Sequence, residues 1–183
     1  MGNEKNMSEN EKSGKRMLTG MFADRESAEN AFSTMHERGY TKDDLNLVMS
    51  DETRKKHFSD EAGETELGTK AAEGAGKGSA IGGTVGAITG VVLALGTSLV
   101  IPGLGLIVAG PIAAGLAGAG AGGITGGIIG ALVGSGIPEE RAKIYESGIK
   151  RGNIVMGIHP RNEEDAEYFE KNWRTNKGEE IHR

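Results

Sequence analysis

The chain has 183 residues, which is enough for one ordinary domain with an insertion. Its net charge of −5 and its lack of a dense lysine and arginine cluster argue against nucleic acid as a partner. The absence of cysteine excludes disulfides, thiolate metal ligands and thiol catalysis.

The chain begins with a polar stretch that leads into a buried strand. Residues 1–16 are rich in Asn, Glu, Lys and Ser, which predicts a disordered tail without the apolar region of a signal peptide. Met17 to Ala23 form an apolar run that is typical of a buried strand. Asp24 is the expected N-cap of a helix. The apolar face of this helix consists of Ala28, Ala31, Phe32 and Met35.

A second strand and a charged stretch follow. Gly39 is expected to end the helix, and alternating apolar residues predict a strand over 45–49. Residues 17–50 therefore form a strand–helix–strand unit. Residues 51–70 are charged and lack periodicity, which predicts a linker with at most a short helix. Their basic triplet, Arg54–Lys56, is flanked by acids and is interpreted as a solvated loop.

Residues 71–137 contain two rows in which glycine recurs at every fourth position, and no charged side chain occurs between Gly78 and Pro138. Four residues are close to one helical turn, so each row predicts a groove along one face of a helix. Each interior glycine costs a helix roughly 0.5–1 kcal/mol relative to alanine, and close packing against a second helix is the expected compensation. The predicted helix-packing and oligomerisation residues are Gly74, Gly78, Gly82, Gly86, Gly90, Gly110, Gly118, Gly122, Gly126, Gly130 and Gly134.

These rows predict a helical hairpin, with helices from about Glu66 to Leu99 and from Pro111 to about Gly136. The 24 uncharged residues 78–101 would extend about 36 Å as a helix, against about 30 Å for a hydrocarbon core. The hairpin tip lacks a polar turn, because the whole stretch 99–108 around it is apolar, and we expect this apolar stretch to be buried in lipid or in other subunits. The tip consists of Ile101, Pro102, Gly103, Leu104 and Gly105.

Three settings for this hairpin remain open. The first is association with the lipid bilayer, with flanking basic residues keeping the folded part at the cytoplasmic face of the inner membrane. The second is a soluble protein that self-assembles into large oligomers or filaments through stacked hairpins. The third is a flexible low-complexity linker, which the many Val, Ile and Leu residues between the glycines disfavour. The first two settings predict a homo-oligomer.

Residues 138–183 predict an exit helix and the second half of the domain. Pro138 is expected at the first helical position, and Gly152 ends this helix. A third strand is predicted over 153–158, and Asn162 caps a last amphipathic helix. Residues 179–183 are long enough for a short edge strand only. The apolar positions of the two helices are Ala142, Tyr145 and Ile149, then Ala166, Phe169 and Trp173.

Without the insertion, the predicted order is β-α-β followed by β-α-(β). This order predicts an α+β protein, a split ferredoxin-like domain that is interrupted by the glycine-zipper helical hairpin.

The sequence offers no group of residues for catalysis. Gly74–Ser79 is similar to a phosphate-binding loop, but Gly78 separates Lys77 from Ser79. The four histidines lack the spacing of a helical metal pair. We therefore predict no catalytic residue, metal, cofactor or small-molecule substrate, and we expect that the protein is not an enzyme. Beside a membrane anchor and a soluble assembly, a third hypothesis for the function is that the sheet binds and senses a ligand.

Three stretches near the insertion form a distinctive pattern. They are Ile101-Pro102-Gly103-Leu104-Gly105, Gly136-Ile137-Pro138-Glu139-Glu140-Arg141-Ala142, and Tyr145-Glu146 followed by Gly148-Ile149-Lys150 and Gly152. With the preceding strand–helix–strand unit, the chain resembles bacterial general stress proteins of the heat-induced, YflT-like kind over residues 17–183. The resemblance implies a bacterial, stress-induced, non-enzymatic protein. The resemblance and the hairpin together predict a membrane-associated stress protein that forms homo-oligomers. The alternative is a soluble structural protein that self-assembles through its hairpins.

Overall fold

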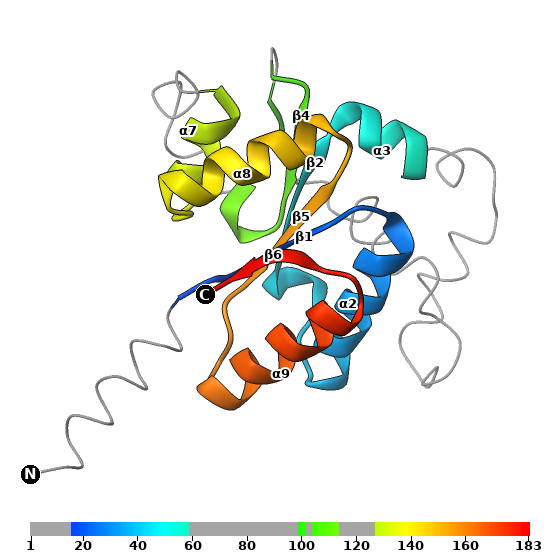
Figure 1. Cartoon of the computed structure of the whole chain (residues 1–183), viewed down its shortest axis with the longest axis vertical. Coiled ribbons are helices and arrows are strands. Elements are labelled where there is room, and N and C mark those ends of the chain that lie inside the picture. The colour runs from blue at the N-terminus through cyan, green and yellow to red at the C-terminus, as the bar shows by residue number, and fades with distance from the viewer. Residues whose placement is uncertain (1–15, 59–98, 102–103, 114–126) are drawn as a thin grey trace, which may run out of the picture.

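The computed structural model describes residues 16–58, 99–101, 104–113 and 127–183. These residues form one sheet of six strands, with helices on both of its faces (Figure 1). The strands are β1 Leu18–Phe22, β2 Leu45–Ser50, β3 Leu99–Ile101, β4 Leu106–Ala109, β5 Ile154–Ile158 and β6 Glu179–His182. The helices are α2 Arg25–Glu37, α3 Asp51–Phe58, α7 Gly127–Gly134, α8 Glu139–Lys150 and α9 Glu163–Thr175, with a 3-10 turn, η1, at Lys42–Asp44.

The strand order is β3-β4-β2-β5-β1-β6, and every neighbouring pair is antiparallel. Since β1 and β2 both pair with β5, they run parallel to each other, and α2 connects them. In the same way β5 and β6 both pair with β1, and α9 connects them. The prediction of an α+β protein is confirmed.

The first half of the domain forms as the sequence predicts. The Asp24 side chain accepts a hydrogen bond of 2.8 Å from the Ser27 N–H and caps α2. Gly39 follows α2 with a φ of +73°, a conformation that glycine adopts without a steric cost. All residues of β1 are buried, because helices cover both faces of the sheet at this central strand. The predicted apolar face of α2 is buried at Ala28, Ala31, Phe32 and Met35.

The charged stretch after β2 begins with a short helix, which the sequence allowed. The interpretation of Arg54–Lys56 as a loop is wrong, although Lys55 and Lys56 are exposed to solvent. These three residues lie in α3. Asp51 forms ion pairs with Arg54 and Lys55, at 3.1 and 2.6 Å. Ser50 Oγ accepts from the Thr53 N–H at 3.0 Å, and Phe58 is buried at the other end of the helix. A hydroxyl cap and one aromatic anchor therefore fix a helix that has no strong apolar periodicity.

The predicted junction between two helices is instead a β-hairpin. β3 pairs with β4, and β4 pairs with β2, so the hairpin extends the sheet. Leu99, the expected end of the first helix, lies in β3. Residues 111–113 are helical and α7 covers 127–134, so parts of the predicted second helix form, whereas 59–98 and 114–126 lie outside the described residues.

The second half of the domain also follows the prediction. Pro138 stands at the N-cap of α8 and makes no side-chain cap, one position before the predicted one. Asn162 accepts from the Asp165 N–H at 2.8 Å and caps α9. β6 is an edge strand beside β1. The predicted apolar positions of both helices are buried, namely Ala142, Tyr145, Ile149, Ala166, Phe169 and Trp173.

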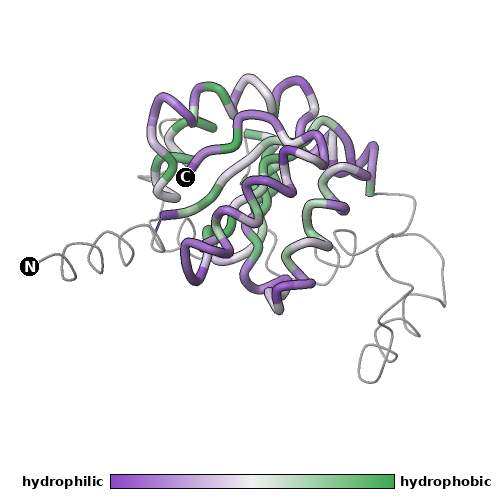
Figure 2. The backbone as a smooth tube through the Cα atoms, turned by 60° about the horizontal axis from the view of Figure 1, so that its bottom comes forward, coloured by the Kyte–Doolittle hydropathy of each residue, from purple (hydrophilic) through white to green (hydrophobic). Residues whose placement is uncertain are grey.

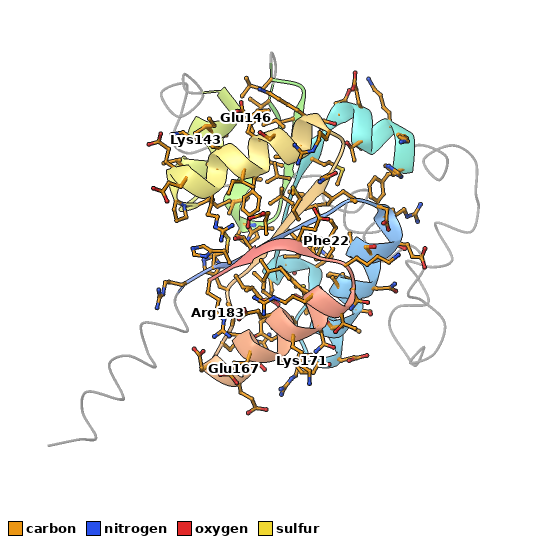
Figure 3. All side chains as sticks on the ribbon, in the orientation of Figure 1. Phe22, Lys143, Glu146, Glu167, Lys171 and Arg183 are labelled. Carbon is orange, nitrogen blue, oxygen red and sulfur yellow. The ribbon has the colours of Figure 1, made fainter. Side chains whose placement is uncertain are left out.

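Two hydrophobic clusters lie on opposite faces of the sheet. One includes Phe22 and Trp173 under α2 and α9, and the other includes Val48 and Tyr145 under α7 and α8. Figure 2 shows that hydrophobic segments concentrate in the strands, between helices with hydrophilic outer parts. Figure 3 shows charged side chains pointing outward from α8 and α9, such as Lys143 and Glu167.

Candidate functional site

The predicted functional residues lie on the glycine rows and at the hairpin tip. Of the glycine rows, the structure describes Gly110, Gly130 and Gly134. The other members lie outside the described residues: Gly74, Gly78, Gly82, Gly86, Gly90, Gly118, Gly122 and Gly126.

Gly110 has a structural role that differs from helix packing. It lies between β4 and the helical turn at 111–113, with a φ of +91°. Its carbonyl oxygen accepts from the Ala113 N–H at 3.0 Å. The β2 backbone at Leu45 and Asn46 lies against the position of a Cβ atom. Gly110 is therefore required for the close approach of this turn to β2, inside a single chain.

The two described glycines of α7 do not form its buried face. That face consists of Ile128, Ala131 and Leu132. Gly134 is exposed and Gly130 is partly buried. Val133, next to Gly134, is 41% exposed.

The hairpin tip is part of the sheet domain. Ile101 is buried, and Leu104 is partly buried against the cluster under α7 and α8. Gly105 is exposed with a φ of +60°, and its carbonyl oxygen accepts from the Asp51 N–H at 2.7 Å. Pro102 and Gly103 lie outside the described residues.

The apolar strand β4 is also buried within the domain. Its residues Leu106 to Ala109 are at most 2% exposed. The expectation that lipid or other subunits bury this apolar stretch is therefore wrong for the described residues, because the sheet and the helices of the same chain cover them.

Asn46 is a functional candidate that the sequence reasoning missed. Its side chain is buried on the α7 and α8 side of β2, and its Oδ1 atom accepts from the Ile112 N–H at 2.9 Å. Its Nδ2 atom donates to the sulfur of Met17 at 3.6 Å. A polar residue inside the apolar run of β2 was the available signal, because buried amides need partners.

Two buried tyrosines join distant parts of the chain. The Tyr145 hydroxyl lies 2.8 Å from both Thr19 Oγ1 and the Glu180 carbonyl oxygen, and burial raises the pKa of this phenol. The Tyr40 hydroxyl donates to Asp165 at 2.7 Å and accepts from the Arg161 N–H at 2.7 Å.

Burial raises the pKa of Tyr40 to about 12. The Arg161 guanidinium lies 4.0 Å above the Tyr40 ring. Both tyrosines therefore remain neutral at pH 7 and hold secondary-structure elements together, as is typical of satisfied buried polar groups.

The histidines do not gather into a reactive site within the described part of the chain. Burial, followed by the positive charge of Lys56, lowers the pKa of His57. Burial, followed by Arg141 and Arg16, lowers the pKa of His182. No group of three or more metal-ligating side chains occurs in residues 16–58, 99–101, 104–113 and 127–183.

None of the helices in the described residues is long and apolar enough to span a bilayer.

No family model matches the chain, and no curated protein or solved structure is significantly similar to it.

Proposed function

We propose that β2, β5, β1 and β6, together with α2 and α9, form a split ferredoxin-like domain. The support is the strand order, in which two β-α-β units interleave so that β1 and β5 occupy the centre. The β3–β4 hairpin then extends such a sheet at its β2 edge.

We propose further that the protein is non-enzymatic and assembles with copies of itself through the glycine rows. The observation that carries this proposal is the β3–β4 hairpin, which attaches the middle of the uncharged segment to the sheet. The most apolar part of that segment is thereby used inside the domain. The glycine rows lie before and after this hairpin in the sequence. Helices with so much glycine need close backbone packing against another helix, and a second copy of the chain provides a matching glycine row.

The short segment between Ala113 and Gly127 favours self-association over an anchor of two membrane-spanning helices. The second row would have to cross the bilayer between two points on the same domain, Ala113 and Gly127. The thirteen residues 114–126 would extend about 20 Å as one helix, which is shorter than a hydrocarbon core of about 30 Å.

Replacing Gly86 and Gly126 with leucine tests the self-association. We expect the native protein to be an oligomer in detergent-free buffer and the double variant to be smaller by sedimentation velocity, because leucine separates the packed backbones. Lys171→Leu adds the same side chain at an exposed position of α9 and serves as the control. A double variant with the native mass would contradict the proposal.

Membrane association is the second candidate. It is favoured by residues 78–98, a run of 21 residues without a charged side chain. Flotation of the full chain with anionic lipid vesicles, followed by an alkaline carbonate wash, distinguishes the candidates. Retention with the washed vesicles supports membrane association, whereas recovery as a large lipid-free particle supports self-association alone.

The proposed role in the bacterial general stress response is supported by the tip residues and by the stretch from Gly136 to Ala142. A rise in the amount of the protein after heat or salt stress in its native cells is expected. Constant amounts under these stresses would contradict the role without affecting the self-association.

A further inference from the structure

Met17 differs in exposure from the other methionines in the described part of the chain. Met21, Met35, Met49 and Met156 are at most 2% exposed, whereas Met17, directly before β1, is only partly buried. Its side chain packs on the edge of the cluster under α7 and α8. Solvent therefore reaches this thioether more readily than those of the other four.

The Met17 sulfur also faces a buried hydrogen-bond donor. Asn46 is 1% exposed, and its Nδ2 atom donates to Met17 Sδ at 3.6 Å. A thioether is a weak acceptor, and no other acceptor for Nδ2 is present among the described residues. The other end of the amide is occupied, because Oδ1 accepts from the Ile112 N–H at 2.9 Å. A strong donor is thus held against a weak acceptor.

The sulfur lies beside a small pocket that is open to solvent. Met17, Asn46 and Gly157 line this pocket. A Cβ atom at Gly157 would lie 3.0 Å from Met17 Sδ, so the sulfur lies against a part of β5 that has no side chain.

We propose that Met17 is a site of oxidation to methionine sulfoxide, and that the sulfoxide oxygen accepts a hydrogen bond from Asn46 Nδ2. Hydrogen peroxide is the oxidant. A sulfur lone pair attacks one peroxide oxygen, and the S–O bond forms as the O–O bond breaks. The departing hydroxide removes the proton from the oxygen that is now bound to sulfur and becomes water. Sulfur loses two electrons and the peroxide gains them.

The fold gives this modification a consequence that the buried methionines lack. At Met35 or Met49 the new oxygen would enter an apolar core without a known donor, which disrupts packing. At Met17 it replaces a weak acceptor with a strong one. The oxidised side chain then strengthens the link from β1 through Asn46 to Ile112. This inference is independent of the proposed self-association.

Peroxide treatment of the full-length protein tests the site. We expect peptide mass spectrometry to show Met17 oxidised at least about tenfold faster than Met21, Met49 or Met156, because oxidation follows exposure. We also expect the side-chain amide proton of Asn46 to shift downfield in ¹⁵N-labelled wild-type protein as the sulfoxide forms. Met17→Leu should abolish this shift.

Asn46→Asp provides the matched variant, because it keeps an acceptor for the Ile112 N–H and removes the donor to sulfur. Peroxide treatment should lower the Tm of Asn46→Asp by more than that of the wild type. If this variant does not fold, the amide shift in the wild type still tests whether the sulfoxide oxygen accepts a hydrogen bond from Asn46. Equal oxidation rates at all methionines, or an oxidised Met17 with an unchanged Asn46 amide, would overturn the proposal.

Discussion

Gly110 and Leu45 approach so closely that a Cβ atom on Gly110 would lie 2.0 Å from the Leu45 carbonyl oxygen. This contact joins the end of the β3–β4 hairpin to the first residue of β2. It places a predicted oligomerisation glycine at an internal contact of the domain, where backbone meets backbone. The contact also fixes where the chain leaves β4.

Gly110→Ala should therefore destabilise the domain strongly. The methyl group meets backbone atoms that cannot move aside, and the φ of +91° adds strain, so we expect a loss of about 3–5 kcal/mol. Gly105→Ala is the matched control, because Gly105 has a φ of +60° and no atom within 4 Å of its Cβ position. Its loss should be about 1–2 kcal/mol, from backbone strain alone. Urea unfolding measures both losses, and equal losses would show that the close contact between Gly110 and Leu45 adds nothing to the cost of the substitution.

The Tyr145 hydroxyl should contribute measurably to stability. Tyr145→Phe removes the group that lies 2.8 Å from Thr19 Oγ1 and from the Glu180 carbonyl oxygen, and we expect a loss of about 1–2 kcal/mol. Tyr168→Phe removes an exposed hydrogen bond to Glu37 and should change stability by less than about 0.5 kcal/mol. Denaturant midpoints of the two variants provide the comparison. A similar small change in both would show that the buried hydroxyl does not stabilise the β6 edge.

Alkaline pH should destabilise the domain through Tyr40. Its folded-state pKa of about 12 lies above the value of about 10 in the unfolded chain. Between these two values the unfolded state loses the proton first, so stability is unaffected below about pH 10 and falls toward about pH 12. Tyr40→Phe cannot titrate and should show a shallower alkaline loss in urea midpoints from pH 8 to 12. An identical slope in both proteins would contradict the assignment.

Asp24 should contribute to acid sensitivity. The hydrogen bond from the Ser27 backbone lowers the pKa of this carboxyl. A lowered folded-state pKa gives stability that is present above the unfolded value and is lost as the pH falls. Asn also caps helices but carries no titratable group, so Asp24→Asn should keep α2 and lose less stability between pH 6 and pH 3. Thermal unfolding across this range measures the difference, and a steeper loss in the variant would contradict it.

The two halves of the domain were predictable because their signals are local. Asp24 and Asn162 are polar caps directly before amphipathic helices, and both accept the expected backbone hydrogen bond. Trp173, predicted to be an apolar position of its helix, is fully buried. Its ring packs edge-on against the ring of Phe22, with 5.6 Å between the ring centroids. Periodicity over ten or more residues identifies such elements without knowledge of the tertiary contacts.

The β3–β4 hairpin could not be separated from the glycine rows by local pattern. Its strands are short apolar runs, and such runs do not distinguish a strand from a buried helix. What decides their structure is the long-range pairing of β4 with β2, which joins residues such as Val48 and Val108. Asn46 is recognisable in the sequence as a polar residue in an apolar run, but its partner Ile112, 66 positions away, could not be predicted from a local pattern. The glycine rows themselves, outside the described residues, remain a prediction.

If the glycine rows bring copies of this chain together, the full-length protein is an oligomer without detergent. Its mass can be determined in detergent-free buffer by sedimentation equilibrium over a range of concentrations. We expect a mass that is a multiple of the 19.1 kDa chain and that persists on dilution. A single species of 19.1 kDa at all concentrations would contradict it.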